Sequence, residues 1–589
     1  MSDTYATAAT TMCAAFQATV RRDPDKIAVR AHDDSVTLTF REWDAQVRAL
    51  TAGFAALGVA RGDAVALMLT NRPEFYPIDV ALQHLGATAF SIYNTSAPEQ
   101  IRYLLTDSGA KVVVCEAQFA ARITASADGE VTVVCIDGTP PDTRALGTVA
   151  AQRDPDFDFE STWRAVQPTD VLTLIYTSGT TGDPKGVQLT HANMLAMIDA
   201  TERKAGLTAA TRFLSFLPSA HVVDRWSALY NLQVVGNQVT TVADRADFLA
   251  GLTAARPTIF GAVPQVWQKL RAGIEQRVSE ATGIRAGLAG WALRVGRVAA
   301  DIRLDGGAPS ALLSLQERVA DALVLSKLRT AVGLDAAEVA ICGAAPVSPD
   351  VLRFFHGVGI PLSDGWGMSE LSGMVTFSPP GQIRLGTVGT VMPGNEIAVA
   401  EDGEVLARGP ILMLGYLGKP EQTAEAIDAD GWLHTGDIGA LDAEGYLTIV
   451  DRKKELIINA GGKNMSPSNI ENWIKAFSPL IGQAVAIGDN RKYNVALISL
   501  DPDTAAVYAE KAGVAADPAV LAKDPEVYRR IEQAVTQANA KLSRVEQIKK
   551  FTIVPDFWEP GSEVLTPTMK LRRKPINERY AAVIAELYG

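Results

Sequence analysis

The fold is decided by residues 176–186, which read Tyr176-Thr-Ser-Gly-Thr-Thr-Gly-Asp-Pro-Lys-Gly186. The run Val171-Leu-Thr-Leu-Ile175 directly before them is short, apolar and rich in branched side chains, which predicts a buried strand. After them, Thr190 can cap a helix that begins near His191. The sequence therefore predicts a strand, a loop and a helix in succession.

The chemistry of this loop points to phosphate. Its glycines permit close backbone approach, its hydroxyls can donate hydrogen bonds, and its lysine supplies a positive charge. The candidate phosphate-binding residues are Thr177, Ser178, Gly179, Thr180, Thr181, Gly182 and Lys185. The order differs from a Walker A loop, which ends in Gly-Lys-Ser/Thr. The alternative is a solvated loop without a ligand.

Residues 176–186 resemble the signature loop of the adenylate-forming superfamily, which includes acyl-CoA synthetases, peptide-synthetase adenylation domains and firefly luciferase. These enzymes join a carboxylate to AMP from ATP, and most of them then pass the acyl group to a thiol. The resemblance extends from about residue 10 to about residue 580. It implies ATP, Mg²⁺ and CoA as cofactors.

Composition narrows the class of protein. A chain of 589 residues is too long for one ordinary domain, and a net charge of −12 argues against nucleic-acid binding. Four widely spaced cysteines (Cys13, Cys115, Cys135 and Cys342) without a CxxC pair fit a reduced cytoplasmic protein without a zinc site. The start of the chain lacks a leader pattern and no long apolar run occurs, so no transmembrane helix is expected. Peripheral membrane contact and a homodimer stay open.

Apolar runs at 65–69, 111–115 and 131–136 predict buried strands that alternate with helices. Such alternation is typical of a parallel sheet with helices on both faces. Together with the resemblance, it predicts an α/β protein with a large N-terminal ATP- and acyl-binding domain of α/β layers over residues 1–450. A hinge at 451–455 would join it to a small mixed α/β domain over 456–589, which is mobile and carries the catalytic lysine.

Phe213–His221 resembles a second block of the family, in which a histidine faces the carboxylate pocket. The resemblance gives His221 a steric and hydrogen-bonding role, because an ionised carboxylate needs no base. The alternative is a core histidine. Trp226 lies five residues further on, one residue later than the tunnel-gating tryptophan of some long-chain relatives, and a core tryptophan is its alternative.

Two apolar helix faces follow further along the chain. The first comprises Ile284, Leu288, Trp291, Val295, Val298 and Ile302, and the second comprises Leu312, Leu315, Val319 and Ala322. We favour helices that cover the core. The alternative is the border of an acyl tunnel, since a helical insert at this place is similar to long-chain and very-long-chain synthetases.

Two further blocks resemble the adenine- and phosphate-binding segments of the family. They assign ATP and AMP binding to Gly343, Ala344, Ala345, Asp364, Gly365, Trp366, Gly367, Met368 and Ser369. Trp366 would lie against adenine, where the family usually has tyrosine, and Ser369 stands where a threonine usually contacts phosphate. Glu370 and Thr177 would hold Mg²⁺, which prefers oxygen ligands. For Glu370 the alternative is a helix-capping carboxylate.

The last blocks resemble the ribose site, the hinge and the catalytic lysine. Asp437 can accept both ribose hydroxyls, and Arg452 would also reach the ribose. The hinge would lie at Lys453 and Lys454. The CoA-facing loop would comprise Ala460, Gly461, Gly462 and Lys463, and Lys570 would be the catalytic lysine. A solvated lysine in a basic loop is the alternative for Lys570.

The blocks together predict an ATP-dependent ligase that converts a fatty acid, with long chains favoured, into acyl-AMP and then into acyl-CoA. Catalysis is assigned to Lys570, Glu370, His221 and Lys185. One alternative is an acyl-AMP ligase that loads a carrier protein, and another is a synthetase for aromatic or branched carboxylates. An inactive nucleotide-binding relative is disfavoured, because such relatives commonly lose the lysine or the acidic residue.

Overall fold

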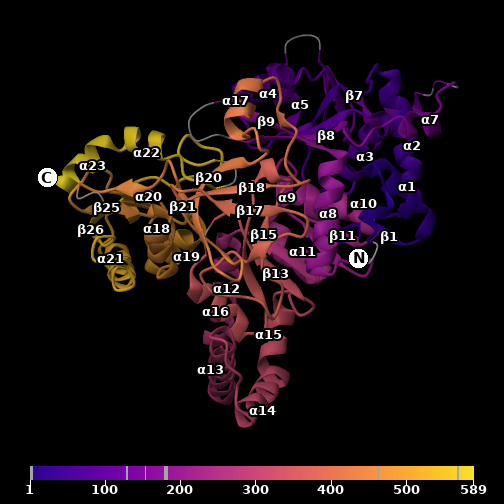
Figure 1. Ribbon diagram of the computed structural model, residues 1–589. Coiled ribbons are helices and arrows are strands. Elements are labelled where there is room, and N and C mark those ends of the chain that lie inside the picture. The colour runs from indigo at the N-terminus through magenta and orange to yellow at the C-terminus, as the bar shows by residue number, and fades with distance from the viewer. Residues whose placement is uncertain are drawn as a thin grey trace.

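A computed structural model describes residues 4–127, 131–152, 154, 156–177, 183–345, 347–460, 463–566 and 569–589. Figure 1 shows a large body of α/β layers, with the C-terminal residues in orange to yellow at one side. Helices α13 (Gly283–Leu304) and α14 (Ala311–Ala320) extend away from that body. The α/β class with parallel sheets agrees with the sequence.

The largest sheet has eight strands in the order β19-β9-β8-β4-β3-β5-β6-β7. Their bounds are β3 Ala64–Met68, β4 Thr88–Ser91, β5 Val112–Cys115, β6 Thr132–Cys135, β7 Arg144–Ala145, β8 Val171–Thr177, β9 Lys185–Thr190 and β19 Gly415–Tyr416. Strands β8 to β7 run parallel in this order, as the buried apolar runs predict.

One local prediction is wrong. Lys185–Thr190 is not the end of a loop but strand β9, which pairs antiparallel with β8, so the signature loop closes a hairpin. The strand forms because Val187 and Leu189 alternate with more polar residues and enter the core. The predicted cap is confirmed, since Thr190 Oγ1 accepts the N–H of Asn193 at 3.1 Å at the start of α8 (His191–Ala205).

Three smaller sheets complete the N-terminal body, which we define as residues 4–452 so that it includes the whole of the last strand. The first has the order β10-β11-β1-β2, the second β12-β13-β14-β15-β16 and the third β17-β18-β20-β21. The bounds are β1 Ile27–Ala31, β2 Thr37–Thr39, β10 Arg212–Ser215, β11 Gln238–Thr241, β12 Ile259–Ala262, β13 Val339–Cys342, β14 Leu362–Trp366, β15 Thr376–Phe377, β16 Thr390–Val391, β17 Glu396–Val399, β18 Glu404–Arg408, β20 Leu433–Leu441 and β21 Leu447–Arg452. Strands β12, β13 and β14 are parallel, so their carboxyl ends meet at one edge.

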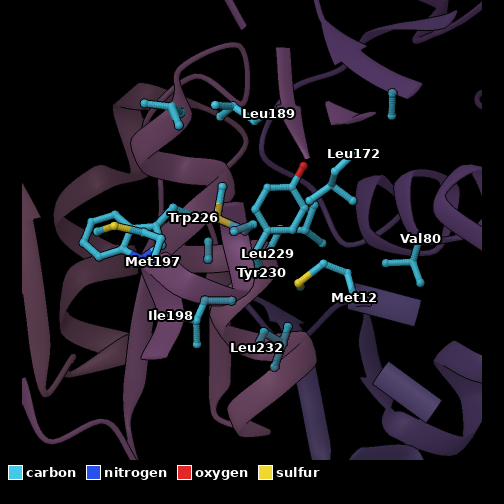
Figure 2. Close-up of a cluster of buried hydrophobic side chains, with 14 of the residues drawn as sticks. Met12, Val80, Leu172, Leu189, Met197, Ile198, Trp226, Leu229, Tyr230 and Leu232 are labelled. Atoms are coloured by element: carbon cyan, nitrogen blue, oxygen red, sulfur yellow. The ribbon is translucent and has the colours of Figure 1, made fainter. Parts of the chain in front are cut away.

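Helices cover these sheets. Their bounds are α1 Met12–Arg22, α2 Phe40–Ala56, α3 Phe75–Leu85, α4 Pro98–Ser108, α5 Ala117–Ser126, α6 Leu146–Ala151, α7 Phe159–Arg164, α9 Val222–Asp224, α10 Asn231–Val235, α11 Phe248–Ala255, α12 Pro264–Ser279, α15 Ser326–Ala331, α16 Pro349–Gly357 and α17 Pro420–Ala426. Figure 2 shows the core where they meet: Met12 of α1, Val80 of α3 and Met197 of α8 gather with Trp226 and Tyr230.

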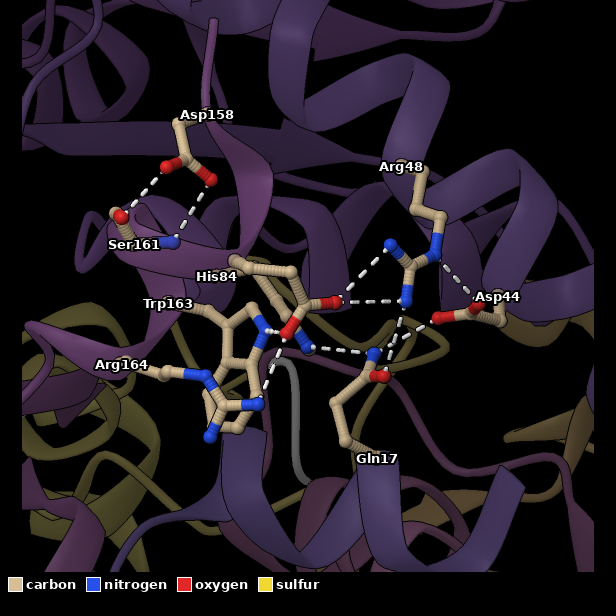
Figure 3. A network of polar contacts seen from close by, with 9 residues as sticks. Gln17, Asp44, Arg48, His84, Asp158, Ser161, Trp163 and Arg164 are labelled. Carbon is tan, nitrogen blue, oxygen red and sulfur yellow. Dashed lines mark hydrogen bonds and ion pairs between the residues drawn. The ribbon is translucent and has the colours of Figure 1, made fainter. Parts of the chain in front are cut away.

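A polar network joins the first helices at the edge of this core (Figure 3). Arg48 of α2 donates to Asp44 at 2.7 Å and to Glu160 at 3.2 Å, and Glu160 also accepts the indole N–H of Trp163 at 3.1 Å. The buried His84 ring lies beside Gln17, and burial lowers the pKa of His84 to about 4. Helices α1, α2, α3 and α7 are thereby held together.

The C-terminal unit, which we define as residues 456–589, has hydrophobic clusters of its own. One surrounds Ile470, Ile498 and Ile531, and the other surrounds Trp558 and Ile576. Its strands are β22 Ile457–Ile458, β23 Asn464–Met465, β24 Ile481–Ile487, β25 Asn494–Leu500 and β26 Ile548–Ile553, and its helices are α18 Pro467–Ala476, α19 Pro502–Ala512, α20 Pro518–Leu521, α21 Pro525–Asn539, α22 Arg573–Arg579 and α23 Ala581–Tyr588.

The predicted role of the apolar faces on α13 and α14 is largely wrong. Val295 is buried, but Ile284 is 92% exposed and Leu312 is 66% exposed. The reason is that the two helices extend away from the body (Figure 1), and α14 uses a different face, with Leu313 and Ala320, to pack against α13. The face that begins at Leu312 neither covers the core nor borders a tunnel.

All four cysteines are free and buried. Burial raises the pKa of the Cys115 thiol to about 12, and it also raises the thiol pKa of Cys13 and Cys342. Within the described part of the chain, every helix is too short or too polar to cross a bilayer.

Candidate active site

The hairpin of β8 and β9 presents the two ends of the signature loop. Thr177 and Lys185 are partners in register, so their side chains lie on the same face of the hairpin. Ser178, Gly179, Thr180, Thr181 and Gly182 lie outside the described residues.

Lys185 belongs to a small cluster with Tyr416 and Glu370. The Lys185 ammonium lies 4.7 Å from the centre of the Tyr416 ring, and the Tyr416 hydroxyl donates to Glu370 Oε1 at 3.0 Å. Burial, followed by the charge of Glu370, raises the pKa of Tyr416. Sequence reasoning missed Tyr416, although its position between Gly415 and Leu417-Gly418 marked a constrained aromatic residue.

The buried carboxylate of Glu370 fits an Mg²⁺ ion that also binds nucleotide phosphates. No group of three or more acidic, histidine or cysteine side chains suited to a metal occurs among the residues described. Mg²⁺ does not need such a cage, because it commonly binds one or two carboxylates together with substrate phosphates and water. The Glu370 carboxylate is engaged by Tyr416 and makes no helix-capping hydrogen bond in the short 3₁₀ turn Ser369–Leu371.

A second cluster joins Trp366, Asp437 and Arg452. The indole N–H of Trp366 donates to Asp437 Oδ2 at 2.8 Å, and Arg452 Nε lies 3.4 Å from Asp437 Oδ1. Asp437 and Arg452 are partners in register on β20 and β21. The sequence predicts stacking for Trp366, and the hydrogen bond from its edge is an additional feature that depends on the meeting of β14 and β20.

The carboxyl ends of β13 and β14 form the wall beside these clusters. Cys342 and Asp364 are paired in register, so Gly343, Ala344 and Ala345 emerge beside Gly365. A side chain at Gly367 would place its Cβ 1.9 Å from the Gly373 carbonyl oxygen, so only glycine fits there. Met368 and Ser369 follow directly. Burial raises the pKa of Asp364 to about 8, although hydrogen bonds from the N–H groups of Val347 and Gly365 act to lower it.

His221 lies within electrostatic range of Lys570. Its Nδ1 accepts the N–H of Val223 at 3.2 Å, and the pKa of His221 is lowered to about 4, first by burial and then by the charge of Lys570. The ring is therefore neutral at pH 7. Trp226 is 6% exposed and packs in the core near Met197, as Figure 2 shows.

Lys570 lies beside a bridge between two residues of the C-terminal unit. Leu565 and Leu571 form a bridge, and within it the N–H of Thr566 donates to the Lys570 carbonyl at 2.9 Å. Lys570 is exposed to solvent, but partial loss of hydration next to the surrounding protein, followed by the charge of Arg452, lowers its pKa, whereas Asp437, Glu370 and Glu455 oppose that change. Lys570 thus lies within electrostatic range of both clusters on the N-terminal body.

The segment that joins the N-terminal body to the C-terminal unit makes contacts with both of them. Lys453 Nζ contacts Asp402 at 2.6 Å and Glu404 at 3.0 Å on the body, whereas Lys454 is exposed. Asp451 accepts the Ser466 hydroxyl at 2.6 Å and the Ser468 N–H at 3.0 Å, which ties β21 to the start of α18. Sequence reasoning missed Asp451, although Ser466-Pro-Ser468 was recognisable as a helix start.

The predicted CoA-facing loop lies in the turn between β22 and β23. The N–H of Ala460 donates to the Arg491 carbonyl at 2.9 Å, and the N–H of Lys463 donates to Asn459 Oδ1 at 3.0 Å. Gly461 and Gly462 lie outside the described residues. The loop is exposed at Ala460 and Lys463, so it is accessible to a ligand.

Comparison with known families gives two matches. The model for the AMP-binding enzyme family matches residues 16–417, and the model for the AMP-binding enzyme C-terminal domain matches residues 454–589. The fatty-acid–CoA ligase FadD11 of Mycobacterium tuberculosis is 53% identical over 451 residues, which cover 76% of this chain and 79% of that protein. The long-chain-fatty-acid–CoA ligase FadD15 of Mycobacterium bovis is 38% identical, with 97% and 95% covered.

Solved structures share the fold. The anthranilate CoA ligase AuaEII in complex with anthranoyl-AMP gives a TM-score of 0.74 at 18% identity, with 98% of each chain covered. A fatty acyl CoA synthetase of Mycobacterium tuberculosis gives 0.62 at 23% identity, with 97% of this chain and 99% of that chain covered.

Proposed function

Because this chain belongs to the AMP-binding enzyme family, we propose that it is an ATP-dependent fatty-acid–CoA ligase that favours long-chain acids. The family membership supports ATP and a carboxylate as substrates. Relatives that align over three quarters or more of the chain are named fatty-acid–CoA ligases, which supports a fatty acid and CoA. The observation that carries the proposal is that Glu370, Asp437 and Arg452, which come from separate elements, all lie near enough to Lys570 for their charges to act on it.

In the first half-reaction, a carboxylate oxygen of the fatty acid attacks the α-phosphorus of ATP. The bond to the β-phosphate breaks, pyrophosphate leaves, and acyl-AMP forms. Lys570 would hold its ammonium between the carboxylate and the α-phosphate and offset their repulsion. Asp437 and Arg452 would orient the ribose, and the neutral His221 would border the carboxylate.

Glu370, with Thr177, would hold Mg²⁺, which neutralises charge on the departing phosphates. Lys185 would stabilise the same phosphates from the other end of the loop, together with the hydroxyl and N–H groups of residues 177–182. The wall of residues 343–345 and 364–369 would surround the adenine and the anhydride, which water must not reach.

In the second half-reaction, the CoA sulfur attacks the acyl carbon, the bond to AMP breaks, and the thiol proton passes to solvent. Residues 1–450 would form the binding domain, residues 451–455 the hinge, and residues 456–589 a mobile domain. Rotation at Lys453 and Lys454 would withdraw Lys570 and bring the Ala460–Lys463 loop to CoA. The separate hydrophobic clusters of the C-terminal unit support its movement as one piece.

A reducing, cytoplasmic setting is also a proposal, supported by four buried free thiols. The activity is tested by AMP release from ATP and Mg²⁺ with acetate, octanoate, palmitate, stearate and benzoate, each with and without CoA. We expect CoA-dependent turnover that is highest with palmitate or stearate. Pyrophosphate exchange without a CoA product would favour a carrier-protein ligase, and turnover with benzoate alone would favour an aromatic-acid ligase.

A further inference from the structure

The helical hairpin of residues 283–331 carries a feature that the proposed reaction does not use. Leu312 is 66% exposed, Leu315 58%, Val319 43% and Leu323 45%. These four side chains, which we call the outer stripe, recur every three or four residues and therefore share one face of the helix.

The outer stripe is distinct from the face that packs within the hairpin. Leu313, Ala320 and Leu325 contact Ala292 and Val295 of α13, so the core of the hairpin is already closed without the stripe. Figure 1 shows α13 and α14 extending away from the body, which leaves their outer surface accessible. A row of large aliphatic residues in such a place indicates a binding surface.

The charges of the hairpin are unlike those of the whole chain. Seven basic and four acidic residues lie between 283 and 331, whereas the chain as a whole has a net charge of −12. Each of the four acidic side chains already has a basic partner: Asp301 pairs with Arg297 and Arg353, Asp305 with Arg353, Glu317 with Arg303, and Asp321 with Arg329.

Four basic side chains of the hairpin remain without an ion pair among the described residues. They are Arg285, Arg294, Arg318 and Lys327, all of them exposed. Arg318 and Lys327 belong to the same helical run as the outer stripe. Apolar side chains beside uncompensated positive charge are typical of helices that lie in the interface of an anionic bilayer.

We propose that the outer stripe docks this protein on an anionic lipid bilayer. The four aliphatic side chains enter the interface, and Arg318 and Lys327 contact lipid phosphates. A second copy of the chain is a poorer occupant, because four half-exposed side chains supply far less than the about 800 Å² that each partner buries in a standard protein interface. The positive charge of one hairpin would also repel that of another.

The test is sedimentation of the full chain with vesicles of phosphatidylcholine containing about 30% phosphatidylglycerol, compared with phosphatidylcholine alone. We expect binding to the anionic vesicles that weakens with salt. The double variant Leu315→Asp, Val319→Asp should lower the partition coefficient about tenfold or more. Arg318→Ala with Lys327→Ala should remove the preference for anionic vesicles. Val507→Asp, at an exposed apolar position on α19, is the matched control and should bind as the wild type does.

These substitutions fall on exposed side chains, and thermal unfolding verifies that each variant is folded. The proposal is overturned if the wild type binds neither kind of vesicle, or if the Leu315→Asp, Val319→Asp variant binds as well as the wild type. Sedimentation velocity supplies the remaining outcome. A dimer that the same double variant disrupts, without vesicle binding by the wild type, would assign the stripe to a second copy instead. None of these measurements depends on the catalytic activity of the protein.

Discussion

The two sides of the candidate active site are built differently. On the N-terminal body, the two carboxylates of the site are held by partners far away in the chain: Glu370 by Tyr416, and Asp437 by Trp366 and Arg452. On the C-terminal unit, the backbone of Lys570 is bonded to Thr566, which lies only four residues earlier in the chain. The difference suggests that one side binds throughout the reaction, whereas the other delivers a charge that can be withdrawn.

Removal of that charge should have the largest effect. We expect Lys570→Ala to slow ATP–pyrophosphate exchange roughly 10³-fold, because one preorganised charge at the reacting phosphate is lost. Thioester formation from supplied acyl-AMP should change little. Lys574→Ala removes an exposed lysine on the neighbouring helix and serves as the control. Equal losses in both half-reactions would contradict the division between the two sides.

On the fixed side, Glu370→Gln should slow exchange about a hundredfold and raise the Mg²⁺ concentration needed for half-maximal rate. Tyr416→Phe keeps the carboxylate but removes its hydrogen bond, so its effect should be about tenfold or less. A Mg²⁺ titration of both variants provides the measurement. An unchanged Mg²⁺ dependence in Glu370→Gln would remove Glu370 from the metal site.

Loss of the Trp366 N–H should act on ATP binding alone. We expect Trp366→Phe to raise the KM for ATP about tenfold with little change in kcat, because a hydrogen bond to a charged group is lost. Trp163→Phe is a matched control, since Trp163 also donates to a carboxylate, that of Glu160, away from the site (Figure 3). The same KM shift in both variants would mean that the effect is structural.

A stiffer connection between the two sides should give a smaller, selective effect. Lys454→Pro fixes φ at an exposed position of the proposed hinge. We expect the thioester step to slow several-fold more than pyrophosphate exchange, because only the second step needs the rotation. Lys454→Ala, which leaves the backbone free, is the control. Unchanged thioester rates in Lys454→Pro would place the hinge elsewhere.

The pH dependence should reveal Lys570 in the resting enzyme. Its pKa is lowered from the ordinary value, and its ammonium form is the one that assists adenylation. We therefore expect kcat/KM for ATP to decline at a pH below the pKa of an ordinary lysine, about 10.4. Bound phosphate should raise the pKa of Lys570, so kcat should decline at a higher pH. If kcat/KM and kcat decline at the same pH, Lys570 is not the titrating group.

Lowering the pH should destabilise the N-terminal body more than the C-terminal unit. All six histidines precede residue 435, and burial lowers the pKa of His84 and His221 to about 4 and that of His191 to about 3. For these three histidines the unfolded chain binds more protons between pH 6.5 and 4, whereas Asp364 and Asp224, whose pKa values burial raises to about 8 and about 7, keep two protons that the unfolded chain lacks. The balance of about one proton lowers the free energy of unfolding of the body by about 1.4 kcal/mol per pH unit as the pH falls. Hydrogen exchange at pH 5 should show earlier opening of the body than of the C-terminal unit, and the reverse order would contradict this.

The sequence predicted the layered α/β fold and its buried strands well, because the apolar composition of runs such as Val112–Cys115 is enough to predict that they are buried. It missed β9, whose pairing with β8 depends on a hairpin that local patterns do not specify. It also missed Tyr416 and Asp451, since their roles depend on contacts between elements far apart in the chain. The apolar spacing at Leu312 predicted a helix face correctly, but periodicity cannot say whether a face meets protein or lies open.

The burial of the four cysteines has a practical consequence for a reaction that consumes a thiol. Because a disulfide reagent must reach a thiol to react with it, the four buried thiols do not compete with CoA for such reagents, and the raised pKa values of Cys13, Cys115 and Cys342 make these three still less reactive. A thiol-titrating dye added to the folded protein should therefore count free CoA alone. The same dye should detect four new thiols per chain when the protein unfolds, so one reagent can follow both turnover and the loss of the native state.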